Sequence, residues 1–264
     1  MEGIQRTKNV RCLLLNDLHF GVSLQSRVSM LRVTNDTDET LINTQEIPCN
    51  VNARQFDHII WDWNGTILDD LPLTVSIVNA QLTKNARLPM SLDEYRGCFT
   101  FPLRVFYRNT GLAGTEEEFM ERNLAFFAEY TKKRGECTLH HGVTRVLDTF
   151  IENGGTHSIL SAYAQNDLTS ITKLFGIDSK FTHIKGADNL EGSSKVDEGH
   201  ALLSLLEYKT SRILFVGDTM HDYEVACSLG VQCALIAKGH QSKEKLSSAQ
   251  ALLLDSHEEL LSYL

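Results

Sequence analysis

The sequence lacks any apolar run that approaches the roughly 18 residues of a membrane-spanning helix. It also lacks an excess of positive charge, since 25 Lys and Arg residues stand against 34 Asp and Glu residues, a formal net charge of −9. This balance argues against nucleic acid and against an anionic membrane surface as partners. An anionic substrate would have to be attracted by local cations, including a bound metal ion.

Cysteine pairs at regular spacings are also absent. The six cysteines include no Cys-x-x-Cys pair, and they are scattered over positions 12, 49, 98, 137, 227 and 233. We therefore expect reduced thiols in a cytoplasmic protein. The first residues do not have the charged and then apolar layout of a secretion signal, which favours the same location.

Length and apolar content indicate a folded α/β protein. A chain of 264 residues can form one large core and a small second domain. The hydrophobic fraction of 42% is enough to fill such a core. After about residue 139, short strands and amphipathic stretches alternate, which predicts a parallel, doubly wound, Rossmann-like sheet.

The most informative segment is Phe56–Asp70, with the sequence FDHIIWDWNGTILDD. An apolar run ends at Asp62, and Gly65 and Thr66 follow shortly after it. A buried strand of this kind places the Asp62 carboxylate at the C-terminal edge of a sheet. Open α/β sheets bind their ligands at that edge.

Three further motifs follow in the same pattern, each near the end of a predicted strand or the start of a helix. They are Ser161 after strand His157–Leu160, Lys195 before helix Val196–Leu206, and Asp218 with Asp222 after strand Ile213–Val216. Carboxylates from two strand ends can hold Mg²⁺, which prefers a few protein oxygens together with water and phosphate oxygens. The order of the four motifs counts for more than Ser161 or Lys195 does alone.

Together the four motifs resemble the haloacid dehalogenase-like hydrolase superfamily, which consists mostly of Mg²⁺-dependent phosphatases. The resemblance covers roughly residues 56–262 and is strongest to the phosphoglycolate phosphatase-like branch. It implies a monomer or homodimer that hydrolyses a small phosphorylated metabolite, phosphoglycolate-like or a sugar phosphate, through an aspartyl-phosphate. It also implies a helical cap inserted just after the first motif.

The same resemblance implies a role for each motif residue. Asp62 is the nucleophile, and Lys195 supplies positive charge to the transferring group. Asp222 orients Lys195 or holds a metal-bound water. The predicted metal ligands are Asp62, the backbone carbonyl of Asn64, Asp218 and Asp222. The predicted substrate contacts are Thr66, Arg104, Ser161, Ala162 and Lys195.

Asn64 departs from the pattern of the resembled phosphatases, most of which have a second Asp here as the general acid and base. The Asn64 amide cannot transfer a proton in that way. Three explanations are open: a slow enzyme or one with a good leaving group such as an acyl phosphate, an engineered replacement of Asp, or different chemistry. The otherwise well-formed motif favours the first.

Two alternative functions follow from Asn64. A phosphonoacetaldehyde hydrolase-like enzyme cleaves a C–P bond with a cap lysine as Schiff base, and the candidate lysines are Lys84, Lys132 and Lys133. A non-catalytic protein on the same fold would bind a phosphorylated ligand without turnover.

The predicted domains are an N-terminal extension over residues 1–55, a core over 56–70 and 139–264, and a cap over 71–138. Residues 1–55 are interpreted as partly disordered or strand-containing, and an Asp-x-His-x-Gly pattern at 17–21 as a chance match or a relic of a larger fusion. In the cap we predict helices Leu73–Leu82 and Glu116–Tyr130. The connecting segment supplies Arg104 and Arg108 as candidate substrate contacts, and Phe99 and Phe101 as cap core.

Other candidates are weaker. His140 and His141 are interpreted as a hinge rather than a metal site, because adjacent side chains point apart. Lys185 competes with Lys195, but only Lys195 opens a helix at the spacing that the resemblance requires. His221 lies between the two acids of the last motif and either tunes them or faces solvent. A final helix is predicted over Glu258–Tyr263.

Overall fold

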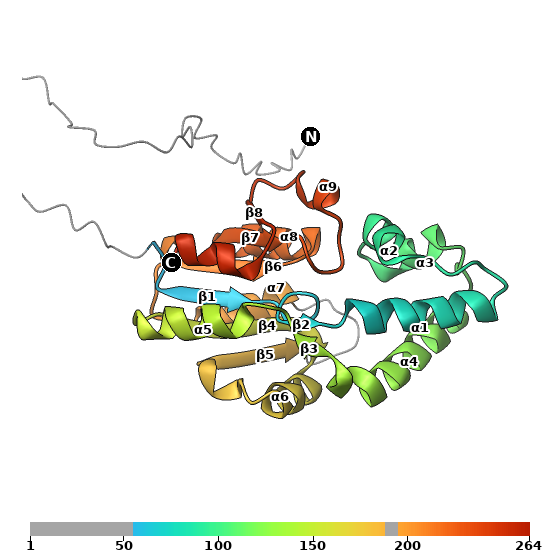
Figure 1. The fold of residues 1–264 in the computed structure, drawn as a ribbon, viewed down its shortest axis with the longest axis horizontal. Helices are drawn as coiled ribbons and strands as arrows, with labels where there is room; N and C mark the ends of the chain where they lie inside the picture. Colours follow the sequence, from blue (N-terminus) through green and yellow to red (C-terminus); the bar gives the residue numbers. More distant parts are fainter. Residues whose placement is uncertain (1–54, 188–194) are drawn as a thin grey trace, which may run out of the picture. The chain divides into compact units, whose positions relative to one another are not determined.

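A computed structural model describes residues 55–187 and 195–264 (Figure 1). The chain divides into two units, Met1–Cys49 and Asn50–Leu264, and the described residues belong to the second. The patterns noted within residues 1–54 and the loop before Lys195 therefore lie outside the described residues. Of the helices in the described part, none is both long and apolar enough to cross a membrane.

The core is a six-stranded parallel sheet in the order β5-β4-β1-β6-β7-β8. This arrangement confirms the predicted doubly wound sheet. The strands are β1 (His58–Trp61), β4 (Thr156–Ala164), β5 (His183–Ala187), β6 (Ile213–Gly217), β7 (Gln232–Ile236) and β8 (Leu252–Leu254). Strand β1 lies at the centre, between β4 and β6.

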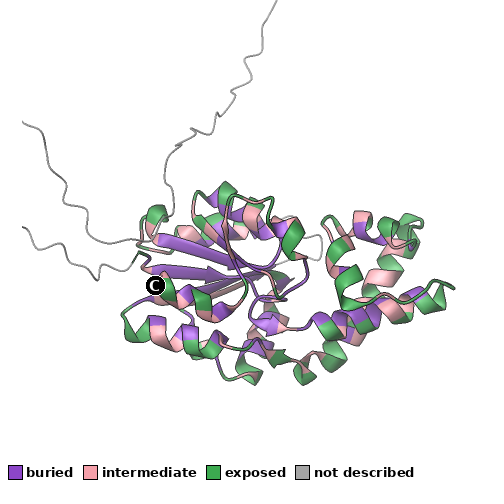
Figure 2. Cartoon of the chain, turned by 45° about the horizontal axis from the view of Figure 1, so that its top comes forward, coloured by how far each residue is buried: buried purple, intermediate pink, exposed green. Residues whose placement is uncertain are grey.

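Helices cover both faces of this sheet because alternate strand side chains point in opposite directions. Ile59 and Trp61 pack on one face, and Ile60 packs on the other. The helices of the first face are α5 (Val143–Glu152), α6 (Gln165–Leu174) and the 3₁₀ helix η4 (His257–Ser262); those of the second are α7 (Lys195–Leu203) and α8 (Met220–Leu229). The central strands β1 and β6 are accordingly buried along their length, whereas β5, β7 and β8 each begin with exposed or partly exposed residues (Figure 2).

Between β1 and β4 the chain forms a helical segment over residues 71–133. It contains α1 (Leu71–Lys84), α2 (Leu92–Cys98), α3 (Leu103–Asn109) and α4 (Glu116–Lys133). These helices enclose a separate hydrophobic cluster that includes Val78, Tyr95 and Phe106. A two-stranded antiparallel sheet of β2 (Leu68–Asp69) and β3 (Thr138–Leu139) closes the base of the segment.

Several local predictions are confirmed, and two are wrong in part. Gly230 ends α8 in the left-handed conformation with φ of 68°, as its position predicts. The predicted final helix is present as the 3₁₀ helix His257–Ser262. Strand β4 continues past Ser161 to Ala164 because the chain shifts its register against β5 there. Phe99 belongs to the helical segment's core, but Phe101 is 41% exposed.

Candidate active site

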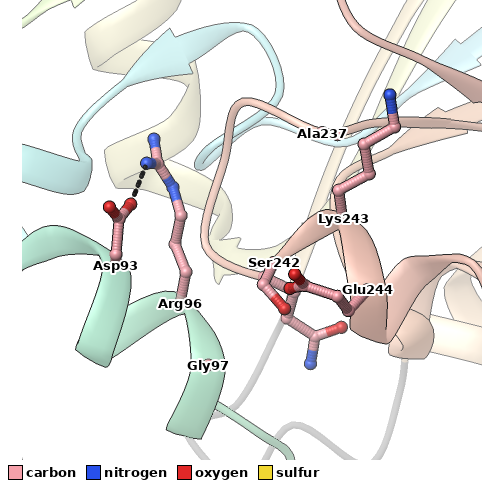
Figure 3. A pocket seen from close by; sticks show the side chains of 8 residues that line it. Asp93, Arg96, Gly97, Ala237, Ser242, Lys243 and Glu244 are labelled. Atoms are coloured by element: carbon pink, nitrogen blue, oxygen red, sulfur yellow. Dashed lines mark hydrogen bonds and ion pairs between the residues drawn. The ribbon is translucent and has the colours of Figure 1, made fainter.

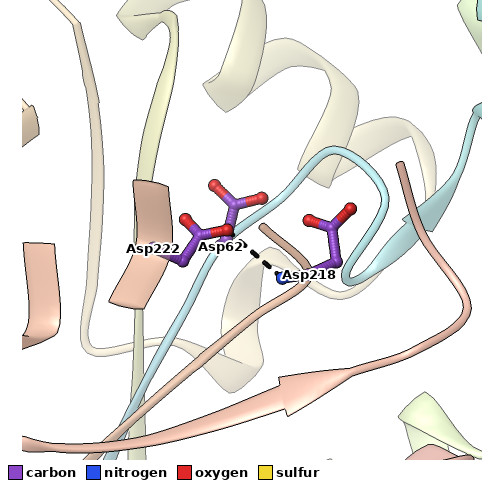
Figure 4. Close-up of side chains that lie close together, drawn as sticks. All are labelled: Asp62, Asp218 and Asp222. Carbon is purple, nitrogen blue, oxygen red and sulfur yellow. Dashed lines mark hydrogen bonds between the residues drawn. The ribbon is translucent and has the colours of Figure 1, made fainter. Parts of the chain in front are cut away.

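Three buried aspartates meet at the C-terminal edge of the sheet (Figure 4). Asp62 follows β1, Asp218 follows β6, and Asp222 lies in the first turn of α8. One carboxylate oxygen from each lies within 4.8 Å of the others. The structure therefore brings the first and last motifs together, as their positions in the sequence predict.

Asp222 is fixed by the start of α8. Its Oδ2 accepts hydrogen bonds from the backbone N–H of Thr219 at 3.0 Å and of Asp218 at 3.2 Å. Thr219 and Asp222 form a capping box, which satisfies N–H groups that a helix start otherwise leaves free. Helix capping and a place in the aspartate cluster are thus compatible, because the second carboxylate oxygen faces the cluster.

Glycines allow the backbone to approach Asp218 closely. At Gly239 a Cβ atom would lie 2.1 Å from Asp218 Oδ2 and 2.5 Å from the Gly65 carbonyl oxygen. Gly65 has a φ of +75°, and a Cβ there would lie 2.4 Å from Asp218 Oδ2. Two loops therefore close around this carboxylate in a way that only glycine permits.

Lys195 joins two of the aspartates. Its Nζ lies 2.5 Å from Asp62 Oδ1 and 2.6 Å from Asp222 Oδ1, and the residue is 4% exposed. Lys185, the competing candidate, lies on β5 and is partly exposed. The structure therefore brings Lys195 between Asp62 and Asp222, two of the residues that the motif order places near it.

The protonation of the aspartates reflects burial and the single lysine. Burial raises the pKa of Asp218 to about 8, and neighbouring Asp222 and Asp62 add to the effect. Burial also raises the pKa of Asp62 to about 6, although Lys195 opposes it. The pKa of Asp222 is lowered despite burial because Lys195 lies against it. The cluster thus holds more negative charge than Lys195 can balance.

Thr66 is part of this cluster, whereas Ser161 and Ala162 make no described contact with it. The Thr66 hydroxyl donates to Asp218 Oδ1 at 3.0 Å and lies 3.5 Å from Asp62 Oδ2. Ser161 is buried on β4 and accepts a hydrogen bond from the backbone N–H of Tyr163. Ala162, the next residue, is exposed.

A second network, which the sequence motifs did not reveal, surrounds Asn64. The Asn64 Nδ2 donates to Asp70 Oδ2 at 2.9 Å and to the Tyr130 hydroxyl at 2.6 Å. Tyr130 in turn donates to the same Asp70 oxygen at 2.7 Å. The other oxygen, Oδ1, accepts from the Gly65 N–H at 2.9 Å and lies 3.1 Å from His240 Nε2.

His240 links this network to the aspartate cluster. Its backbone N–H donates to Asp218 Oδ2 at 2.6 Å, and Nδ1 lies 3.3 Å from the Tyr95 hydroxyl. Burial lowers its pKa, but the Asp70 and Asp218 carboxylates outweigh burial and raise the pKa to about 9. Hydrogen bonds and the His240 charge lower the pKa of Asp70 in spite of its burial.

The sequence contained only weak indications of a role for these residues. Asp70 is the second acid of an Asp69-Asp70 pair, and Tyr130 was expected only as an apolar position of α4. His240 stood in a loop to which no role was assigned. Their convergence depends on tertiary packing, which a single sequence does not state.

The structure places Arg104 and Arg108 away from the aspartates. Both are exposed on α3. Arg104 pairs with Glu116 and lies over the Phe119 ring at 4.1 Å, so its described contacts are within the helical segment. A small pocket there is lined by Arg104 and Arg108. These two arginines do not meet the remaining predicted site residues.

The helical segment is attached to the core by hydrogen bonds near Arg96. This side chain donates to the carbonyl oxygens of Gly239 and Lys238, at 3.0 Å each. Beside this contact lies a pocket of about 380 Å³ between α2 and the segment that leads into α9 (Lys243–Leu246) (Figure 3). Its lining includes Asp93 and Lys243 but none of the three aspartates.

Two of the histidines considered from the sequence, His140 and His221, have defined surroundings. His140 is buried and stacks on His257, with ring centroids 5.1 Å apart. His257 Nε2 lies 2.6 Å from the Thr66 carbonyl oxygen. His221 is partly exposed and lies beside Phe101, with centroids 5.1 Å apart. These contacts do not involve the aspartates, but His221 adds to the lowering of the Asp222 pKa that Lys195 mainly causes.

Comparison with known proteins adds a relationship by descent. Residues 59–236 match a family model described as haloacid dehalogenase-like hydrolase. The chain is 25% identical over 213 residues to phosphoglycolate phosphatase 1 of Pseudomonas aeruginosa, covering 77% of this chain and 78% of the relative. It is 23% identical over 211 residues to the phosphoglycolate phosphatase of Synechococcus elongatus, covering 77% and 94%.

Solved structures share the fold. A haloacid dehalogenase-like family hydrolase from Streptococcus pneumoniae superposes with a TM-score of 0.67, covering 79% of this chain and 98% of that one. The sequence identity of that pair is 19%. At this sequence identity, the similarity shows that the two proteins share the fold of the core and of the inserted helices.

Proposed function

Because this chain belongs to the haloacid dehalogenase-like hydrolases and is a phosphatase, we propose that it transfers the phosphoryl group of a small metabolite to Asp62 in a Mg²⁺-dependent reaction. The observation that carries this proposal is the convergence of Asp62, Asp218 and Asp222 around Lys195. A phosphate monoester is dianionic, so a carboxylate nucleophile needs cations beside it.

The donor set fits a divalent cation. Four buried carboxylates, Asp62, Asp70, Asp218 and Asp222, face two buried cationic groups, Lys195 and His240. Burial, and after it the neighbouring Asp222 and Asp62 carboxylates, raises the pKa of Asp218. Asp62 and Asp218 would hold Mg²⁺, with the Asn64 carbonyl and Asp222 as further candidates. When bound, Mg²⁺ would neutralise the carboxylates and the charge of the phosphate.

In the first step an Asp62 oxygen attacks phosphorus, and the bond from phosphorus to the leaving oxygen breaks. Lys195, held by Asp222, stabilises the charge on the transferring group. In the second step water attacks phosphorus, and the bond to Asp62 breaks to release phosphate. Asn64 cannot provide or remove the protons of these steps, so leaving groups that need no protonation should react fastest.

The relatives indicate the size of the substrate. Both curated relatives bear the name phosphoglycolate phosphatase, and we propose phosphoglycolate or a similarly small phosphorylated metabolite for this chain. The helical segment over residues 71–133, which makes up most of the predicted cap of residues 71–138, would admit this substrate. The proposed substrate contacts are still Thr66, Ser161, Ala162 and Arg104. Arg104 would reach the site only if the cap moves.

The test uses p-nitrophenyl phosphate with and without Mg²⁺. We expect Mg²⁺-dependent turnover that falls at least about a hundredfold in Asp62→Asn, because the variant loses the nucleophile. Mg²⁺ at a hundred times its Kd should also stabilise the folded protein by about 2.7 kcal/mol. Asp218→Asn should lose that stabilisation, which gives a readout that does not depend on activity.

The result also separates the alternatives. Tight binding of a phosphate analogue without turnover would indicate a binding protein and contradict the proposal. Covalent capture of a carbonyl substrate on a lysine by borohydride would indicate C–P bond hydrolysis. The structure gives that alternative little support, since Lys84 is exposed, and Lys132 and Lys133 pair with Glu129 on the outside of α4.

A further inference from the structure

The Asn64 side chain has a fixed orientation, and chemistry determines which way its amide faces. Four groups direct donors at the two oxygens of Asp70, and the Gly65 N–H among them can only donate. Asp70 therefore acts as an acceptor, and the Asn64 atom that lies 2.9 Å from it must be the NH₂ group.

Both hydrogens of this NH₂ group have acceptors. One is directed at Asp70 and the other at the Tyr130 hydroxyl, which uses its own proton on Asp70. The remaining polar atom of the Asn64 side chain is Oδ1, which can only accept. Asp70 and Tyr130 are 2% and 3% exposed, whereas Asn64 is partly exposed. The buried residues thus form a rigid support for an amide that reaches accessible space.

We propose that Asp70 and Tyr130 are positioning residues that hold the Asn64 amide with Oδ1 available to accept a hydrogen bond from the water that hydrolyses the phospho-enzyme. This inference rests on the proposed function. It replaces proton abstraction at position 64 with orientation of the water, which is a recognised way to assist attack on phosphorus. The water's proton passes to phosphate or to solvent.

The support comes from two parts of the chain that are distant in sequence. Asp70 is the single residue between β2 and α1, and Tyr130 lies in α4 of the helical segment. Both hydrogens of the amide thus have acceptors only while α4 stays packed against the core. The second chemical step would then depend on the helical segment more strongly than the first.

The experiment separates the two steps by rapid mixing with p-nitrophenyl phosphate. The burst of p-nitrophenolate reports phosphoryl transfer to Asp62, and the steady rate reports hydrolysis of the phospho-enzyme. We expect Tyr130→Phe to lower the steady rate roughly tenfold or more, with the burst rate changed by less than about threefold. Intact mass measurement should show more phospho-enzyme in the variant during turnover.

Tyr163→Phe is the matched control. Tyr163 is also buried and its ring packs against that of Tyr130 with centroids 6.0 Å apart, but its hydroxyl bonds Arg134. The control should keep the wild-type ratio of burst to steady rate. If Tyr130→Phe and Tyr163→Phe alter both steps alike, or if Tyr130→Phe alters neither, the proposal is overturned.

A double-mutant cycle tests whether Tyr130 acts through Asn64. In the Asn64→Ala background, Tyr130→Phe should have no further effect on the steady rate, because the amide it positions is gone. A full additional loss in that background would contradict the proposal. Failure of the proposed function looks different, since the wild-type protein would then show neither a burst nor turnover.

Discussion

At the residue scale, Asn64 and Asp70 form a pair whose chemistry depends on one being an amide and the other a carboxylate. The Asn64 Nδ2 lies 2.9 Å from Asp70 Oδ2, and Asp70 is 2% exposed. Two ionised carboxylates cannot share this distance in a buried site, so one would have to bind a proton. The amide at position 64 therefore agrees with its surroundings, which supports a natural residue rather than a damaged motif.

This pairing predicts that Asn64→Asp alone destabilises the protein. We expect its free energy of unfolding at pH 7.5 to fall by about 3 kcal/mol, because a charge is added beside a buried charge. The exchange Asn64→Asp with Asp70→Asn restores one donor and one acceptor. In urea unfolding, the double variant should lose at least about 2 kcal/mol less stability than the two single variants lose in total. Additive losses would refute the pairing.

At the scale of elements, the sequence predicted those strands and helices that depend on a local pattern of apolar and polar residues. Apolar runs ending at Asp62 and Asp218 gave the strands, and the place of Lys195 gave its helix. The extent of β4 beyond Ser161 was missed because a shift in strand pairing is a tertiary event. The 3₁₀ geometry near the C-terminus likewise follows packing against α5 rather than sequence period.

The sequence predicted the motif residues of the site more fully than those that tertiary packing adds, although Ser161 and Ala162 make no described contact with the aspartates. Asp62, Thr66, Lys195 and the two later aspartates come together as their order suggests. The supporting residues Asp70, Tyr130 and His240 come from a turn, a helix of the inserted segment and a late loop. No single-sequence period relates those three positions, so their convergence could not be foreseen.

The close packing of the loop between β7 and α9 predicts that one added methyl group lowers the activity strongly. In Gly239→Ala the new Cβ would lie 2.1 Å from Asp218 Oδ2, so the loop or the carboxylate must move. A displacement of about 1 Å at a reacting centre costs roughly a hundredfold, and we expect kcat/KM to fall by at least that factor.

Gly97→Ala is the control for that experiment. Gly97 lies in α2, and a Cβ there would meet nothing within 4 Å. Activity should stay within about twofold of wild type, since alanine also suits a helix better than glycine. Equal activity of the two variants would show that the approach of Gly239 to Asp218 does not matter.

At the scale of the whole molecule, buried neutral histidines make stability depend on pH. The Trp61 indole N–H donates to His157 Nδ1 at 3.0 Å, and His157 Nε2 lies 3.1 Å from the Leu147 carbonyl oxygen. This arrangement suits only the neutral ring, because a protonated Nδ1 could not accept. Burial accordingly lowers the pKa of His157 from 6.5 to about 4.

The lowered pKa of His157 determines the direction in which stability changes with pH. Between pH 6.5 and 4 the unfolded chain binds a proton at this histidine and the folded chain does not, so stability is complete above pH 6.5 and declines on acidification. His157→Asn removes this contribution. The stability gap between wild type and this variant should therefore shrink by about 2 kcal/mol from pH 7.5 to pH 5.

Urea unfolding at the two pH values measures that gap. A substitution of the exposed Leu88, which does not titrate, should leave its own gap to wild type the same at both pH values. A His157→Asn gap that does not change with pH would show that His157 titrates normally in the folded protein.

The central place of β1 in the sheet has a consequence for synthesis on the ribosome. One neighbour of β1 is β6, and the Asp57–Arg212 ion pair at the start of these two strands joins residues 155 positions apart. At about 5–20 residues per second, the apolar edge of β1 waits roughly 8–30 s for its partner to be made. The inserted helices, whose contacts are local, can form during that interval. Although β4 can pair with the other edge of β1 earlier, the nascent chain therefore exposes the β6 edge of this strand during that interval. We expect its yield in cells to depend on chaperones that shield such edges until β6 emerges.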